Sequence, residues 1–96
     1  MHRFMTEAEL TQIDQRCRKA APGPWLSFVA GRDHESGASY IMTGPDDSRG
    51  PDFEISGASA QDQDFIAGAR ADIPRLLEEV RVLHEILLAK NGIHMA

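Results

Sequence analysis

The chain has 96 residues, of which 42% are hydrophobic and 26% charged, and its formal net charge at pH 7 is −5. A chain of this size folds as a single domain, residues 1–96, and buries only about 60 to 65% of the surface that its unfolded form exposes. Self-association is therefore an expected source of additional core. The acidic balance argues against a nucleic-acid polymer as partner, because contact with a long phosphate backbone requires a basic face.

The N-terminal residues lack the apolar core of a signal peptide, and no apolar run approaches the ~18 residues that span a bilayer. Cys17 is the single cysteine, so no internal disulfide can form. We therefore expect a cytoplasmic protein with no membrane partner.

Residues 7–21 have the pattern of an amphipathic helix. Thr6 and Glu9 have the spacing of a capping box, in which each side chain accepts a hydrogen bond from the other residue's backbone N–H. An apolar stripe recurs at spacings of three and four, formed by Leu10, Ile13, Cys17 and Ala20. The segment 22–24, Pro-Gly-Pro, ends this helix because proline cannot continue it.

Residues 25–56 are predicted to form three short strands. The runs WLSFVA, SYIM and DFEIS are rich in aromatic and branched residues, and polar loops containing Gly separate them. These loops favour an antiparallel meander, since parallel strands require a long crossover. A sheet of three strands needs a helix over one face to be stable. Trp25, at the entry to the first strand, is expected either to fill the core or to offer a stacking surface.

Residues 59–91 have the pattern of a long helix, with Ser59 as N-cap, Asp62 in the first turn and Gly92 as C-cap. Apolar residues alternate steps of three and four, which is the pattern of a heptad seam; they are Ile66, Ala69, Ile73, Leu76, Val80, Leu83 and Leu87. A second row comprises Phe65, Leu77, Ile86 and Leu88. One row is expected to cover the sheet and the other to meet a second helix, either the first helix or a partner's. Ile73, Leu76, Val80, Leu83 and Leu87 are the predicted oligomer interface.

Pro74 interrupts this helical pattern. Either the helix is kinked, or Asp72 caps a new helix and two helices join at Ala71 and Asp72. Both alternatives place Arg70 and Asp72 at a break, where a guanidinium beside loose backbone donors can hold an anion. The structural alternative is that Arg70 pairs with Asp72 or Asp62 and fixes the bend. The fold class is therefore α+β: an N-terminal helix, a three-stranded antiparallel sheet and a long Pro-kinked C-terminal helix, in a homo-oligomer.

The sequence offers no catalytic or metal-binding signature. The four histidines lack the spacing of a helical zinc site; they are His2, His34, His84 and His94. Cys17 lies on an apolar stripe, where it behaves as a small hydrophobe. No pair of carboxylates can be placed across a cleft for acid and base work. We therefore expect neither an enzyme nor a metal or other cofactor.

Two motifs resemble a group of small phage and prophage proteins. The segment 20–25, AAPGPW, is similar to the A-x-P-G-P-W turn of this group, and 62–80, DQDFIAGARADIPRLLEEV, is similar to its F-I-A-x-A-R-x-D-(I/V)-P-x-L-L helix. The two motifs cover about a quarter of the chain, in the order found in the group. The group includes anti-Thoeris sponge proteins, which sequester a cyclic ADP-ribose-type immune signal without cleaving it.

The resemblance implies a phage anti-defence protein in the host cytoplasm, acting as a homo-dimer or higher homo-oligomer that binds a cyclic nucleotide. The ligand residues that it favours are Arg70, Asp72, Asp62, Phe65, Trp25, Phe28 and Arg32, in which cations would clamp phosphate oxygens and aromatic faces would stack on bases. The alternative is a protein-interaction module that docks a host or phage protein through its C-terminal helix.

Overall fold

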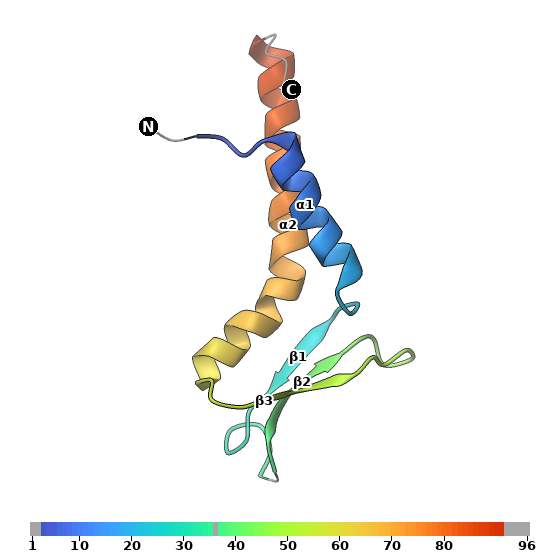
Figure 1. The fold of residues 1–96 in the computed structure, drawn as a ribbon, viewed down its shortest axis with the longest axis vertical. Helices are drawn as coiled ribbons and strands as arrows, with labels where there is room; N and C mark the ends of the chain where they lie inside the picture. Colours follow the sequence, from blue (N-terminus) through green and yellow to red (C-terminus); the bar gives the residue numbers. More distant parts are fainter. Residues whose placement is uncertain (1–2, 36, 92–96) are drawn as a thin grey trace. The chain divides into compact units, whose positions relative to one another are not determined.

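The computed structural model describes residues 3–35 and 37–91. His2, His94 and the expected C-cap Gly92 lie outside the described residues. The elements follow in the order α1 (Glu7–Lys19), β1 (Trp25–Phe28), β2 (Ser39–Thr43), β3 (Asp52–Ile55) and α2 (Ala60–Asn91) (Figure 1). The predicted two helices and three strands, and hence the α+β class, are confirmed; the homo-oligomer stays a prediction. Contacts divide the chain into two units, one with α1 and α2 from Ile73 onward, the other with Ala20–Asp72.

The first helix begins with the predicted capping box. The backbone N–H of Thr6 donates to Glu9 Oε1 at 2.9 Å, and the backbone N–H of Glu9 donates to Thr6 Oγ1 at 3.1 Å. The bond from Thr6, together with Arg3, holds the pKa of Glu9 below its usual range. In the predicted stripe Leu10 is buried, and Ile13, Cys17 and Ala20 are half-buried. The helix therefore forms where the sequence predicts it and ends two residues earlier, at Lys19.

The three strands form one antiparallel sheet in the order β1-β2-β3 (Figure 1). Ile41 on the central strand is fully buried, with Ser27 of β1 and Phe53 of β3 as its cross-strand partners. The turn after β2 needs a glycine at position 44, because φ is +85° there and an added Cβ would lie 2.6 Å from the Ser48 carbonyl oxygen. The loop 44–51 thus folds tightly back onto the end of β2, where Thr43 Oγ1 donates to the Pro51 carbonyl at 2.6 Å.

The second helix is uninterrupted from Ala60 to Asn91, with Pro74 inside it. Of the two alternatives for Pro74, a break into two helices at Ala71 and Asp72 is wrong. Pro74 has no N–H to donate to the carbonyl four residues earlier, so the helix tolerates a local loss of backbone bonding. The helix starts at the predicted cap: Ser59 Oγ accepts from the Asp62 backbone N–H at 3.0 Å, and Asp62 Oδ2 accepts from the Ser59 N–H at 3.2 Å. Neither helix, within residues 3–35 and 37–91, combines the length and apolar character needed to cross a membrane.

In the first part of α2, the residues that are buried belong to neither of the two predicted apolar rows. Gln63 and Ala67 are the buried residues there, whereas Phe65 is 78% exposed and Ile66 41% exposed. The expectation that one of the two apolar rows covers the sheet is therefore wrong for this part of the helix. The reason is that a polar residue, Gln63, is held on the sheet by hydrogen bonds that the apolar periodicity cannot reveal.

From Ile73 onward, α2 shares a unit with α1. Leu77 is buried, and Arg81 pairs with Glu7 of α1, with 3.5 Å between Nη2 and Oε1. Leu88, from the second predicted row, is half-buried. The face that includes Leu77 and Arg81 therefore meets α1.

Candidate functional site

From Ile73 onward, α2 carries several large apolar side chains that are exposed to water. These residues, which we name the outer face, are between 41 and 62% exposed and comprise Ile73, Leu76, Val82, Leu83, Ile86 and Leu87. Leu76 is the most exposed of them, at 62%. Four of the five predicted interface residues belong to the outer face, and the fifth, Val80, is half-buried. Monomeric proteins rarely leave so much large apolar surface uncovered, so the outer face is a candidate interaction surface.

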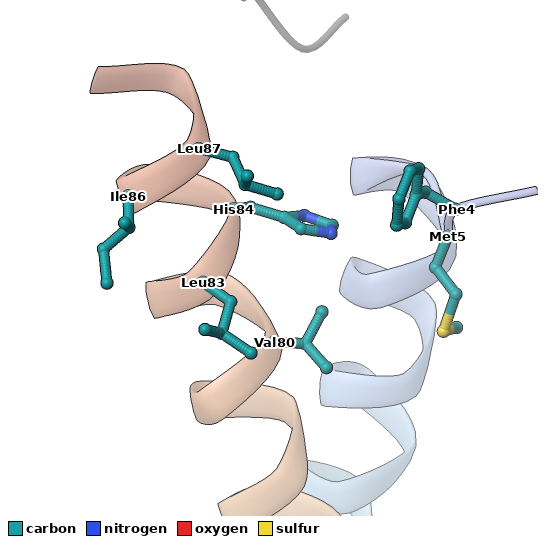
Figure 2. Close-up of a pocket in the computed structure, with 7 residues that line it drawn as sticks. All are labelled: Phe4, Met5, Val80, Leu83, His84, Ile86 and Leu87. Atoms are coloured by element: carbon teal, nitrogen blue, oxygen red, sulfur yellow. The ribbon is translucent and has the colours of Figure 1, made fainter. Parts of the chain in front are cut away.

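An apolar groove lies at the N-terminal end of α1, and three residues of the outer face contribute to it, Leu83, Ile86 and Leu87. It has a volume of about 480 Å³ and is lined by Phe4, Met5, Val80, Leu83, His84, Ile86 and Leu87. Figure 2 shows His84 pointing from α2 toward Phe4, and the two rings meet edge to face with centroids 6.4 Å apart. The groove has the size of a small-molecule pocket. However, its lining contains no Lys or Arg, and none of the predicted ligand-binding residues contributes to it.

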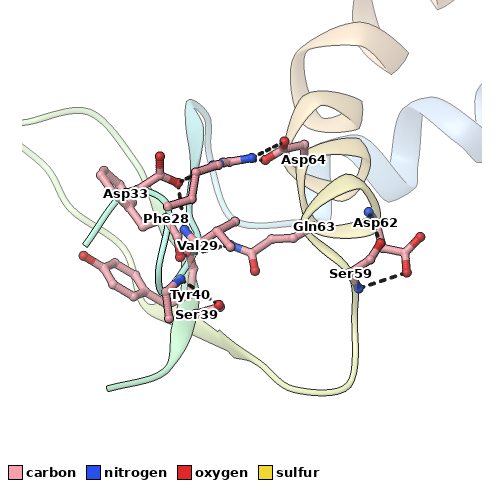
Figure 3. A network of polar contacts seen from close by, with 11 residues as sticks. Phe28, Val29, Asp33, Ser39, Tyr40, Ser59, Asp62, Gln63 and Asp64 are labelled. Carbon is pink, nitrogen blue, oxygen red and sulfur yellow. Dashed lines mark hydrogen bonds and ion pairs between the residues drawn. The ribbon is translucent and has the colours of Figure 1, made fainter. Parts of the chain in front are cut away.

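The predicted anion clamp Arg32 is already paired with two carboxylates. Its Nη1 lies 2.7 Å from Asp64 Oδ2, and its Nη2 lies 3.0 Å from Asp64 Oδ1 and 2.8 Å from Asp33 Oδ2. The guanidinium lowers the pKa of Asp64 to about 2 and also lowers that of Asp33, because both carboxylates accept charged hydrogen bonds from it. Figure 3 shows Asp33 and Asp64 converging from a loop and from α2. A bound phosphate would have to displace these carboxylates from Arg32.

Several other predicted ligand residues have structural partners of their own. The Asp62 carboxylate caps α2. The indole N–H of Trp25 donates to the Ala21 carbonyl at 3.0 Å, and its ring meets Phe53 edge to face at 5.1 Å. Phe28 stacks on Tyr40 at 5.3 Å. Trp25 and Phe28 are both half-buried, whereas Phe65 is an accessible aromatic face.

Arg70 lies against the Pro-Gly-Pro turn. It is half-buried, and its Cγ and Nε lie 3.4 and 3.8 Å from the position that a Cβ on Gly23 would occupy. The two motifs that carry the family resemblance therefore contact each other in the fold. Gly23 admits the arginine stem, which gives Arg70 a packing role. Asp72, two residues later, is exposed, and its Oδ2 lies 3.6 Å from the Cβ position of Gly68.

Sequence reasoning missed Gln63, which joins α2 to the sheet. Its side chain is 1% exposed, and Nε2 donates to the carbonyls of Phe28 at 3.2 Å and Tyr40 at 3.0 Å (Figure 3). The available signal was its spacing of four from Ala67, a small residue on the same helix face. The Arg32–Asp64 pair was missed as well, because its members are far apart in sequence.

Comparison of the chain with known protein families, curated proteins and solved structures finds no match. In the part of the chain that the structure describes, no group of three or more His, Cys, Asp or Glu side chains is arranged to hold a metal ion.

Proposed function

We propose that this chain is a homo-oligomeric binding protein that sequesters a cyclic ADP-ribose-type nucleotide without cleaving it, as a phage anti-defence sponge. The assembly part of the proposal is supported by the exposed outer face of α2. The ligand part is supported by the resemblance of the two motifs and by the place of Arg70 where they meet.

The argument for assembly depends on the free energy gained when the exposed apolar surface of the outer face is buried. The six outer-face side chains together leave the equivalent of about three whole side chains exposed. Burying a whole Val, Leu or Ile side chain contributes about 1.5 to 3 kcal/mol, so each chain offers about 5 to 9 kcal/mol and two chains about twice that. Association costs about 4 to 15 kcal/mol in lost freedom of motion. The apolar area that a second copy could cover is therefore of the size needed to offset the cost of association.

The ligand case rests on the chemistry that a cyclic dinucleotide-like signal requires. Its phosphate oxygens need charged donors, and a guanidinium offers two parallel N–H bonds to them. Its bases need accessible aromatic faces, and Phe65 provides one on the same helix as Arg70. Because the chain carries a net charge of −5, such a site has to be local to these residues.

The test of the ligand case is recovery of the bound molecule. The protein is mixed with cyclic ADP-ribose isomers, freed of unbound ligand and heat-denatured, and the released material is identified by mass spectrometry. Intact ligand supports a sponge, altered ligand supports an enzyme, and no uptake contradicts ligand binding. Arg70→Ala should abolish uptake while Arg16→Ala, an exposed change on α1, should not. If Arg70→Ala unfolds the chain, Arg70 is structural.

A second candidate function is favoured by the apolar groove. A groove whose lining is apolar except for one histidine suits an apolar protein segment better than a nucleotide. This is the alternative in which α2 docks another protein. A chain that takes up no nucleotide and remains monomeric at high concentration would favour this alternative over the sponge.

A further inference from the structure

We infer that the exposed face of the three-stranded sheet docks an amphipathic helix of another protein, one whose apolar side is flanked by basic residues. This inference goes beyond the proposed nucleotide binding and assembly, and it concerns a different surface of the chain. It follows from the residues that the sheet turns toward water and from the distribution of charge along the chain.

The two faces of the sheet differ in burial. Side chains alternate between the faces along each strand, and cross-strand partners share a face. One face carries Ser27, Ile41 and Phe53, of which Ile41 is fully buried. The opposite face carries Tyr40, whose ring projects away from Gln63 of α2 (Figure 3). This second face, which we name the open face, consists of two rows of cross-strand partners: Leu26, Met42 and Asp52 in one, and Phe28, Tyr40 and Glu54 in the other.

The open face is apolar where the solvent side of an antiparallel sheet is normally polar. In each row the residues of β1 and β2 are apolar or aromatic, and the residue of β3 is a carboxylate. Leu26 is 42% exposed, while Met42, Phe28 and Tyr40 are half-buried. Stable folds bury an apolar sheet face under another layer. A helix, about 10 Å wide, covers two strands that lie about 4.8 Å apart.

The carboxylates of β3 define the chemistry of the helix that fits. Asp52 and Glu54 are exposed, and neither side chain forms a hydrogen bond or an ion pair with another described residue. Both lie along one side of the apolar part of the open face, so a helix packed over β1 and β2 places one flank beside them. Arg or Lys residues on that flank would pair with the carboxylates while their apolar stems cover the neighbouring side chains.

The distribution of charge favours such a partner over a second copy of this chain. The unit Ala20–Asp72 contains nine Asp and Glu residues and three Arg residues, a formal charge of −6, whereas the whole chain carries −5. The negative charge is therefore concentrated in the unit that contains the sheet. Two such units repel each other on close approach, whereas a basic partner is attracted.

The first test measures the binding of synthetic peptides by fluorescence anisotropy at about 0.15 M salt. The probe has about 18 residues, enough to form a helix, with leucines at spacings of three and four and arginines flanking them. One control peptide has glutamate in place of every arginine, and another has the same composition in an order without an apolar stripe. Only the probe should bind. No saturable binding of the probe up to about 1 mM, or equal binding of either control, overturns the inference.

The second test locates the bound probe on the open face. Glu54→Lys should raise its dissociation constant about tenfold, whereas Asp47→Lys, the same charge change in an exposed loop, should alter it less than about twofold. Leu26→Ser should also raise the constant about tenfold. Its control is Leu76→Ser, at an exposed leucine of α2, which should have little effect. Equal effects of the two members of either pair overturn the inference.

The oligomeric state tests the choice of occupant. Leu26→Asp places a charge in the apolar part of the open face and should leave the molar mass in size-exclusion light scattering unchanged, because another protein covers this face. A lower mass would show that a second copy covers it, and this result also overturns the inference.

Discussion

The side-chain amide of Gln63 joins the first turn of α2 to two strands of the sheet at once. Its two donated bonds satisfy the carbonyls of Phe28 and Tyr40, which are cross-strand partners. A buried polar side chain of this kind is stabilising only while its bonds are made, because an unmade bond leaves the full desolvation cost. The amide of Gln63 is therefore one of the groups that hold the helix on the sheet.

Gln63→Leu should lower the free energy of unfolding by about 1 to 3 kcal/mol, because it leaves two carbonyls without their donor. The measurement is urea denaturation followed by circular dichroism. Gln61→Leu, an exposed change in the same turn, is the control and should have little effect. Equal stability of the two variants would contradict the role assigned to Gln63.

The Arg32–Asp64 pair makes stability depend on pH in the acid range. The folded-state pKa of Asp64 is lowered to about 2, below its unfolded value, so its contribution is present above about pH 4 and is lost as the pH falls toward 2. Asp64→Asn should therefore flatten the fall of the melting temperature between about pH 4 and pH 2. Thermal melts across this range measure it, with Asp47→Asn as an exposed control. An unchanged acid slope in Asp64→Asn would mean that the pair does not form in solution.

At the scale of elements, local sequence signals predicted what forms and where it begins. The capping boxes at Thr6 and Ser59 and the Pro-Gly-Pro turn act over a few neighbouring residues, so they can be identified from sequence alone. Which face of α2 turns inward could not be predicted in the same way. The inward face carries Gln63 and Arg81, and the partners that stabilise them, such as Glu7, lie on distant segments.

The cap of α2 is expected to contribute measurably to stability. Ser59→Ala removes the acceptor of the Asp62 backbone N–H and should lower the free energy of unfolding by about 1 kcal/mol. Ser56→Ala makes the same chemical change at an exposed position before the helix and should alter it little. Guanidinium denaturation compares the two. A similar decrease in the free energy of unfolding in both variants would show that loss of the helix cap does not cause the destabilisation.

At the scale of the whole molecule, the sequence predicted an apolar seam, and four of its interface residues belong to the outer face. The ligand cluster was less predictable. Arg32 finds Asp64 through tertiary contact, and the approach of Arg70 to Gly23 joins two motifs that are separated by the whole sheet. The identity of a charged residue in the sequence does not reveal which residue it pairs with in the fold.

Leu83→Asp should reduce the molar mass in size-exclusion light scattering to that of one chain, since it places an unpaired charge in the proposed contact. Leu26→Asp is the matched control, because Leu26 is 42% exposed on β1 and lies outside α2. It should keep the native mass. An unchanged mass for Leu83→Asp would contradict assembly through the outer face.

The small number of buried hydrophobic side chains in one chain affects how its folded fraction depends on concentration. Among the described residues, only Leu10, Ile41, Ala67 and Leu77 are buried hydrophobic side chains. When folding draws part of its free energy from association, the folded fraction rises with total concentration. The concentration of folded protein then rises more steeply than the total concentration of the chain. At low total concentration a larger fraction of the chains is unfolded and open to proteolysis.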